Sequence, residues 1–486
     1  MKKPNIFTRA LAALRLPGAR QAMANYYHAA EATRMFFDWV QQSTSHDDEI
    51  KRDLGKLRAR ARDLDRNNSY AKRFLKLVSA NVVGPGGIKT QPQVRNGNGE
   101  LLKDVNAAIA AAFDEFWLNP WLDEKHNGPQ GERLLARALE IDGEVFVRVH
   151  RGVGEFGLKL SHLDPDLIDH TYFREAGRGL NEIRLGIEID AAGKMVAVHA
   201  WDQYPTAGHA SRRVRISADD VWHIFDPERI NQTRGVSSFA PVAGLLKILD
   251  GLLEAELVLS KIAASKMGFF VARDAANFDA ELFKSFSSQG INAKSGSALA
   301  LPPGVEFQAW DTGSSSGNLE PLSKLILRSI GAGLSVSYSA LANDLSDANY
   351  SSMRGGELID RDQWRIKQQT LIGFRRLVHA EFVKMATLTG KLKLPHPDYR
   401  RFLAARFVGR GWSWVDPLKD IQAAVLAINN GLATRREVLA EQGRDVDTVF
   451  EDLAEENMAA DRLGLEFLGL PAAPLTDAGE NERGEP

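Results

Sequence analysis

Acidic side chains are the groups in this sequence whose spacing could support catalysis or metal binding. Asp344, Asp347 and Glu357 could form paired carboxylates for general acid–base chemistry. No His or Lys lies near them to complete such a site, so solvated or capping roles are the simpler interpretation. Asp164 and Asp166 could hold a metal ion, but acids at the end of a strand more often cap a turn. The sequence therefore predicts no catalytic residue and no metal ligand.

Motifs that would identify an enzyme are missing from the sequence. It contains no GxxxxGK[ST] phosphate loop, no GxGxxG after a strand, no HExxH and no nucleophile elbow. The absence of cysteine excludes disulfides, thiolate zinc sites and cysteine nucleophiles. His223 is more simply a packed strand residue than a ligand. We expect a protein that is not an enzyme and binds no cofactor.

Basic and aromatic side chains could instead contact nucleic acid or a neighbouring protein. Tyr350 and Trp364 could stack on bases, although helix packing or an intersubunit contact is the simpler interpretation. One helix carries arginines that could form a solvated face or make intersubunit or phosphate contacts, namely Arg58, Arg60, Arg62 and Arg66. The residues alone leave both interpretations open.

Composition limits what the chain can be. Its 486 residues allow about three domains. Lys+Arg is 61 and Asp+Glu is 63, for a net charge of -2, which argues against a protein held to DNA by bulk positive charge. The most apolar long segment, 241–266, contains charged residues, among them Lys247, Asp250, Glu254, Glu256 and Lys261, and is not a simple membrane span. The first 24 residues are interpreted as an N-terminal arm.

The elements that must position these side chains predict an α+β fold. Helices are expected over 47–80, broken at Asn67–Ser69, and around 105–117 and 130–139. Alternating patterns predict strands at 144–151, 157–163, 184–189, 195–201, 213–216 and 221–225. A helical rod follows from residue 238, then a Gly/Ser-rich segment and a returning helix from Pro321.

The sequence of the C-terminal third predicts a polar loop followed by helices. The loop covers 343–356, and a long helix of basic and apolar residues covers 357–389. Pro417, Asn430–Gly431 and the capping box at Thr434 mark three short helices between 416 and 463. The segment 464–486 has a disordered composition. A helix, a small module and a returning helix bury little surface alone, which favours neighbouring copies that supply the missing contacts.

Short segments along nearly the whole chain carry a family resemblance. They are RARARDLDRNN at 58–68, NVVG at 81–84, GEVF at 143–146, LDPD at 163–166, HIF at 223–225, RGVS at 234–237, NYSS at 349–352 with Arg354, RFVGRGW at 406–412 and WVDP at 414–417. Each is short, but their order and spacing together are specific. In these segments the chain resembles the portal proteins of tailed bacteriophages, in the lambda-type family.

The resemblance implies an elongated subunit made of named parts. They are a mixed α/β wing (25–235), a stem of two helices (236–267 and 319–342), a small α/β clip (268–318), a tunnel loop (343–356), a tunnel helix with a return to the wing (357–415) and a helical crown (416–463).

The resemblance also implies a function and partners. Twelve identical subunits would form a ring at one vertex of the capsid, through which double-stranded DNA is packaged and ejected without sequence specificity. The ring would dock the large subunit of the packaging terminase and the major capsid and head–tail adaptor proteins, with no membrane contact. It would lie in the virion, and in the host cytoplasm during assembly.

Site residues follow from this expectation. A conduit must let DNA slide, and Asp250, Glu254 and Glu256 would keep the stem wall from binding phosphates. The tunnel-loop residues expected to make weak contacts with DNA are Asn349, Tyr350, Ser351 and Ser352, with Arg354 as the cation that approaches it. The alternative for Arg354 is a salt bridge to Asp344, Asp347 or Glu357. The alternative for the whole chain is a monomeric assembly scaffold or adaptor without a channel; a nuclease or protease lacks any convergent motif.

Overall fold

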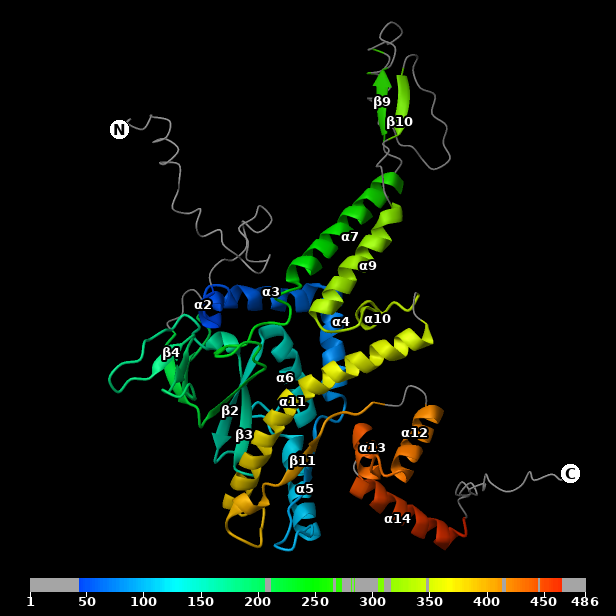
Figure 1. Ribbon diagram of the computed structural model, residues 1–486. Coiled ribbons are helices and arrows are strands. Elements are labelled where there is room, and N and C mark those ends of the chain that lie inside the picture. The colour runs from blue at the N-terminus through cyan, green and yellow to red at the C-terminus, as the bar shows by residue number, and fades with distance from the viewer. Residues whose placement is uncertain are drawn as a thin grey trace, which may run out of the picture.

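The computed structural model describes residues 43–205, 211–264, 268–272, 281, 284, 305–309, 316–346, 349–412, 417–444 and 446–465. The expected N-terminal arm, most of 268–318 and nearly all of the tail 464–486 lie outside the described residues. The described part is an α+β fold, as predicted: a mixed body with a helical hairpin projecting from it and a separate group of C-terminal helices (Figure 1).

The first helices are broken where the sequence predicts. Asn68 ends one helix, and its side chain accepts a hydrogen bond of 2.9 Å from the backbone of Ala71 to cap the next. The elements are α2 (His46–Ile50), α3 (Leu54–Asn67), α4 (Ser69–Val78) and a π-helical turn, η3 (Ser79–Val83).

Two antiparallel sheets form the mixed part of the body. One has the order β3-β2-β8 and the other is the meander β4-β5-β6-β7. Five predicted strands are confirmed as β2 (Glu144–Arg151), β3 (Leu158–Leu163), β6 (Met195–Trp201), β7 (Arg213–Ser217) and β8 (Val221–Phe225). The single strand expected over 184–189 is wrong, because the chain turns at Leu185 and Gly186, where φ is positive, and forms the antiparallel pair β4 (Glu182–Arg184) and β5 (Ile187–Ile189). The body also contains α5 (Lys103–Leu118), α6 (Gly128–Asp142) and the pair of β1 (Lys89–Pro92) with β11 (Ala405–Val408).

The projecting hairpin consists of α7 (Ala243–Ala264) and α9 (Ser316–Gly333), which lie side by side (Figure 1). Beyond it, β9 (Gly268–Ala272) pairs with β10 (Val305–Ala309). The expected start of the returning helix at Pro321 is wrong, because α9 already begins at Ser316 and contains Pro321. A proline this close to a helix start removes only one backbone hydrogen bond, so the helix tolerates it.

The segment after the hairpin also differs from the expectation. α9 ends at Gly333, and a separate short helix, α10 (Tyr338–Ala342), follows instead of one helix to 342. The next helix, α11 (Tyr350–Leu388), begins seven residues before the expected 357. A polar composition rich in Asn, Asp and Ser indicated a loop over 343–356, but its second half is helical; Gly355 and Gly356 each cost a helix only about 1 kcal/mol, and a 39-residue helix packed on the body tolerates that.

The C-terminal helices match the prediction. Thr434 and Glu437 form the expected capping box. The helices are α12 (Pro417–Asn429), α13 (Arg435–Glu441) and α14 (Val446–Leu463). None of the described residues of α12 and α13 is buried, whereas α14 buries Val446 and Ala460, so this group has only a small core.

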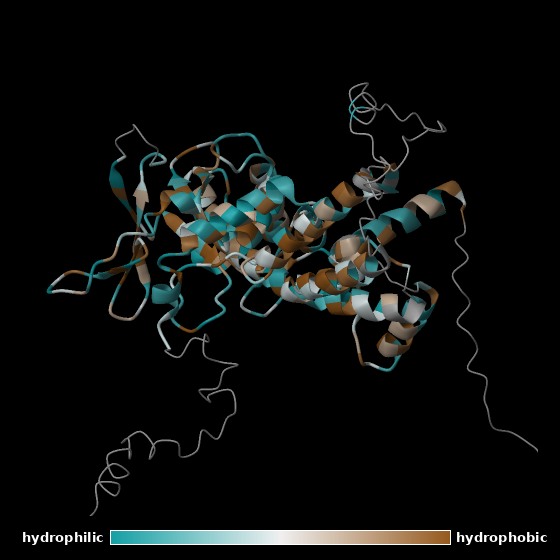
Figure 2. Ribbon diagram, turned by 90° about the horizontal axis from the view of Figure 1, so that it is seen from above, coloured by the Kyte–Doolittle hydropathy of each residue, from teal (hydrophilic) through white to brown (hydrophobic). Residues whose placement is uncertain are grey.

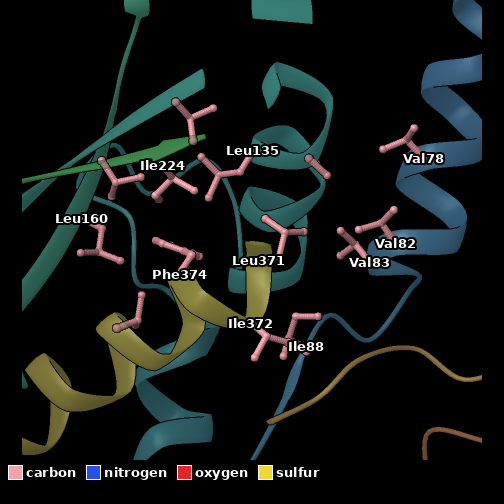
Figure 3. Close-up of a cluster of buried hydrophobic side chains, with 14 of the residues drawn as sticks. Val78, Val82, Val83, Ile88, Leu135, Leu160, Ile224, Leu371, Ile372 and Phe374 are labelled. Carbon is pink, nitrogen blue, oxygen red and sulfur yellow. The ribbon is translucent and has the colours of Figure 1, made fainter. Parts of the chain in front are cut away.

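One hydrophobic core joins the body to the base of the hairpin. It contains side chains from α4, α6, β2, the first turns of α7, the end of α9 and the middle of α11. Figure 3 shows part of it, where Leu371 and Phe374 of α11 lie near Leu135 and Leu160 of the body. The base of the hairpin is therefore fixed, whereas its far end projects away from the body (Figure 1).

Candidate functional site

The arginines of α3 form part of an ion cluster inside the chain. Arg58 is fully buried and forms an ion pair with Glu144. Arg62 binds three carboxylates at 2.6 to 2.7 Å, those of Asp142, Asp164 and Asp166. The expectation of a solvated or intersubunit face is therefore wrong for Arg58 and Arg62, because intrachain acids hold both. Arg60 and Arg66 are exposed and stay candidates for such a face.

Glu144 lies at the centre of this ion cluster and has no solvent exposure. It accepts hydrogen bonds from Arg234 Nε at 2.7 Å and from Gly235 N at 3.1 Å, and it pairs with His223 Nε2 at 2.7 Å. Burial raises the pKa of Glu144, but the positive charges of Arg234 and Arg58 outweigh burial and hold that pKa well below its usual range. The carboxylate therefore stays ionised at every pH at which the protein would work.

The ion cluster fixes the chain where it enters the hairpin. A Cβ atom on Gly235 would lie 2.1 Å from the carbonyl oxygen of Gly143, so only glycine allows this approach. Arg234 also donates to the carbonyl of Leu185 at 2.6 Å. The segment leading into α7 is thus tied to α3, β2 and β8 at one buried point.

Two of the simpler sequence interpretations are confirmed at this ion cluster. His223 is packed in its strand, with its ring stacked 4.2 Å from that of Phe146. Asp164 caps a turn by accepting from the backbone of Asp166 at 2.9 Å. Glu144 and Arg234 were not singled out from the sequence. The available signals were an acid directly before three apolar residues in the GEVF segment and the arginine of the RGVS segment.

The three acids of α7 do not form one wall. Asp250 accepts from Asn68 Nδ2 at 3.0 Å and therefore faces the α3–α4 junction. At about 100° per residue, Glu254 lies about 40° from Asp250 around the helix, whereas Glu256 lies about 120° away on the other side. Of the three, Glu254 is exposed, whereas Asp250 and Glu256 are partly buried.

The hairpin leaves apolar side chains exposed on both of its helices. On α7, Ile248 is 60% exposed and Leu257 is 63% exposed; on α9, Leu325 is 59% exposed. Gly251 of α7 has open space where a side chain would lie, although glycine weakens a helix by about 1 kcal/mol relative to alanine. Figure 2, seen from above, shows hydrophobic residues on helices at the edge of the molecule as well as on helices in its middle. The packing of this single chain explains neither the exposed side chains nor the glycine.

The predicted loop contacts are only partly positioned by the structure. Asn349 is exposed, and Tyr350, Ser351 and Ser352 form the first turn of α11, where their side chains lie outside the description. Arg354 forms an ion pair of 2.8 Å with Asp420 of α12. Arg354 therefore does form a salt bridge, as the alternative interpretation expected, but this partner is Asp420 of the C-terminal helices and not one of the three acids named from the sequence.

The remaining candidates have structural roles. The Asp344 carboxylate accepts from Tyr338 Oη at 2.7 Å and from Ser346 N at 3.0 Å, and these hydrogen bonds lower its pKa. This is the capping role expected for Asp344. Glu357 pairs with Arg361 at 2.5 Å, and Trp364 is buried in the core, which confirms the packing interpretation for Trp364. Asp347 lies outside the described residues.

Neither a metal centre nor a membrane segment is found in the part of the chain that the structure describes. No three or more His, Asp or Glu side chains in it are grouped closely enough to hold a metal ion. None of its helices combines the length and the hydrophobicity needed to cross a bilayer.

Comparison with known proteins identifies the family to which the chain is similar. The model of the family described as phage portal protein, lambda family, matches residues 32–368. A probable portal protein of Halomonas phage phiHAP-1 is 31% identical over 455 residues, which cover 90% of this chain and 87% of that protein. Portal protein B of Escherichia phage lambda is 23% identical over 478 residues, which cover 88% of each chain.

Solved structures include a more distant match. A chain from the virion of a native gene transfer agent particle aligns with a TM-score of 0.48 and 13% identity, covering 81% of this chain and 93% of that one. This score is too low to transfer an assembly from that particle.

Proposed function

The chain belongs to the lambda family of phage portal proteins, and from this premise we propose that it forms a homo-oligomeric ring at one capsid vertex, through which double-stranded DNA is packaged and ejected. The ring would be twelve-membered, as the family resemblance implies. In this assignment the body is the wing, α7 and α9 are the stem, 268–318 is the clip, and α12, α13 and α14 form the crown.

The uncovered faces of the stem carry the proposal of a ring. Burying an exposed Ile or Leu side chain stabilises an assembly by about 1.5–3 kcal/mol at most. Ile248, Leu257 and Leu325 together, repeated in every copy, would supply a substantial driving force. A neighbouring copy also explains why Gly251 is small, because a second helix could approach closely there.

The two stem faces favour a ring over a symmetric dimer. On α7, Gly251 and exposed Ile248 lie about 60° apart around the helix, whereas α9 presents Leu322 and Leu325. Unlike faces on one subunit favour a heterologous contact, which closes into a ring when the rotation between copies permits.

The charges near the loop suit DNA that must slide. Asp420 neutralises Arg354 in the chain as described, so a phosphate would have to compete with a carboxylate for this cation. We infer that Arg354 and Asn349 make weak contacts that do not depend on sequence, and that Glu254 disfavours phosphate binding on the stem.

Partners follow from the same assignment. The clip would dock the terminase large subunit, and the wing and crown would meet capsid and head–tail adaptor proteins. The ring would lie in the virion, and in the host cytoplasm during assembly. Like its family, the protein is expected to act structurally, without catalysis.

Mass measurement of the purified protein tests the ring. One chain has a mass of 53.6 kDa, whereas twelve would exceed half a megadalton. Light scattering during size exclusion should give the larger value, with a central hole in negative-stain images. A particle near the mass of one chain would instead support the scaffold or adaptor alternative.

Replacing each member of the Arg354–Asp420 ion pair tests the DNA contact. Arg354→Ala removes a cation, and Asp420→Ala removes the same ion pair but leaves the cation. If Arg354 contacts DNA, Arg354→Ala should lower DNA retention severalfold in assembled rings, whereas Asp420→Ala should preserve or increase it. Equal losses in both variants would show that only the ion pair matters.

A further inference from the structure

Asparagine stands directly before glycine at four places in the chain. The pairs are Asn96–Gly97, Asn98–Gly99, Asn127–Gly128 and Asn430–Gly431. Asparagine is a chemically labile residue, and a following glycine has no side chain to hinder attack by its own backbone nitrogen on the asparagine side chain. The local structure around each pair then decides how fast that reaction can run.

The pair at the start of α6 is protected by the helix. The Asn127 side chain accepts a hydrogen bond of 2.9 Å from Gln130 N and so caps the helix. Gly128 is buried, and a Cβ atom on it would lie 1.8 Å from the indole nitrogen of Trp117. Neither the amide group nor the glycine can therefore move without disturbing the packing of α6.

The pair at the end of α12 is also held by hydrogen bonds. Asn430 Nδ2 donates to Leu426 O at 2.8 Å. Gly431 N, the nitrogen that would attack, donates to Ile428 O at 3.1 Å. Both reacting groups are engaged, so the helix end has to unwind before they can meet.

Asn96 is held through its side chain. Its Oδ1 accepts from Asn98 N and from Glu100 N, both at 2.9 Å. Its Nδ2 donates to the carboxylate of Glu100 at 2.9 Å. The amide group has to turn toward the Gly97 nitrogen to react, and these three hydrogen bonds oppose that rotation.

Asn98 differs from the other three asparagines. It is exposed, and its side chain forms no hydrogen bond to any described residue. The attacking nitrogen, Gly99 N, is restrained by one hydrogen bond of 3.0 Å to Asn96 O, which closes an exposed turn between β1 and α5. Nothing lies within 4 Å of where a Cβ atom on Gly99 would be, so a five-membered ring has room to form. A surface turn closed by a single hydrogen bond opens easily.

We propose that Asn98 is a site of spontaneous deamidation. When the turn opens, a base removes the proton from Gly99 N, and this nitrogen forms a bond to Cγ of Asn98. The bond from Cγ to Nδ2 breaks, and ammonia leaves with a proton from the solvent. Water then opens the resulting succinimide at either carbonyl, which gives aspartate or isoaspartate. This inference goes beyond the proposed function and does not depend on it.

Both products would change the turn. Each adds a carboxylate beside Glu100, and isoaspartate also lengthens the main chain. Gly99 would then lose its hydrogen bond to Asn96 O, together with the one of 2.7 Å that its carbonyl accepts from Arg95. The turn between β1 and α5 should therefore lose its fixed form, while the core of the body is unaffected.

Peptide mapping of the full-length protein by mass spectrometry tests the proposal. After incubation of the folded chain at mildly alkaline pH, Asn98 should be converted severalfold faster than the asparagines of the other three pairs. The rate should fall at neutral pH, because a base has to remove the proton from the attacking nitrogen. The same chain in denaturant is the matched control, since without structure the four pairs should react at similar rates.

Replacement of single asparagines gives a second test. Asn98→Gln should remove most of the isoaspartate that isoaspartyl methyltransferase labels in aged protein, because glutamine would have to close a larger and slower ring. Asn430→Gln removes an asparagine from another pair and should leave the labelling nearly unchanged. Faster conversion at another pair in the folded chain, or equal labelling of Asn98→Gln and the original chain, would overturn the proposal.

Discussion

Glu144 is the residue on which the ion cluster depends. It is the shared carboxylate of Arg58 and Arg234, and neither guanidinium has contact with solvent. Buried ions are tolerated only when they are paired and hydrogen bonded, because removing them from water costs several kcal/mol each. The stability of the connection between the body and the hairpin therefore depends strongly on one side chain.

Glu144→Gln should be strongly destabilising. Two buried arginines would lose their shared negative charge, at a cost of about 3–5 kcal/mol. Chemical denaturation followed by circular dichroism would measure the loss. Glu182→Gln is the control, because the Glu182–Arg184 pair is half-exposed and such pairs contribute about 0–1 kcal/mol. Similar losses in the two variants would show that the ion cluster has no special weight.

His379 should make stability depend on pH. Burial, with a smaller effect of the Arg375 charge, lowers its pKa from 6.5 to about 4. The folded chain then binds fewer protons than the unfolded chain, so stability falls as pH drops from about 6.5 to about 4. This residue should contribute a loss of about 2 kcal/mol between pH 7 and pH 5.

Replacing His379 would check its share of this pH dependence. Among the described residues, neither ring nitrogen has a hydrogen-bond partner, and the ring packs on Phe113 and Phe407. His379→Phe should therefore fold and show a smaller loss of unfolding free energy at pH 5. If the variant and the original chain have the same pH dependence, other groups cause it.

At the scale of elements, the sequence predicted those whose patterns are local. Strand alternation and the caps at Asn68 and Thr434 depend on neighbouring residues, and β2, β6 and β8 appear with the expected bounds. The start of α11 was missed because the polar residues of 343–356, rich in Asn, Asp and Ser, are typical of a loop, whereas packing of the long helix on the body extends it through the second half of this segment.

Long-range contacts explain what the sequence could not predict at the site. The four arginines of α3 look alike in sequence, but Arg58 meets Glu144 across 86 residues and Arg62 meets Asp166 across 104. Nothing in the local pattern distinguishes them from Arg60. The short segments that carry the family resemblance do meet in space: Asn81 Oδ1 accepts from Arg410 at 2.9 Å and from Trp412 at 3.1 Å.

The exposed side chain of Ile248 on α7 should matter for assembly but not for the folding of one chain. Ile248→Asp changes an exposed side chain, so the free energy of unfolding of the single chain should change by less than about 0.5 kcal/mol. In a ring it would bury a charge, and light scattering should show smaller particles. Glu254→Ala, on a nearby exposed position, is expected to leave ring mass unchanged. Full-sized rings of Ile248→Asp would show that this face is not an interface.

At the scale of the whole molecule, the C-terminal helices behave as a separate unit. α12 and α13 bury none of their described residues, and exposed Leu426 and Leu432 indicate that this unit has little core of its own. Calorimetry of dissociated chains should therefore show the unit unfolding at a lower temperature than the body. Removing 417–486 should abolish the first transition and shift the main one by no more than a few degrees. A single transition in both proteins would mean that the unit is coupled to the core.

The buried ion cluster also constrains how the chain is made. Arg58 leaves the ribosome long before Arg234, and at about 5–20 residues per second the interval is roughly 10 to 35 s. During that time the nascent chain holds part of a charge network that cannot yet close. The body can therefore complete its fold only after about the first half of the polypeptide has emerged, which gives molecular chaperones a defined period in which to protect it.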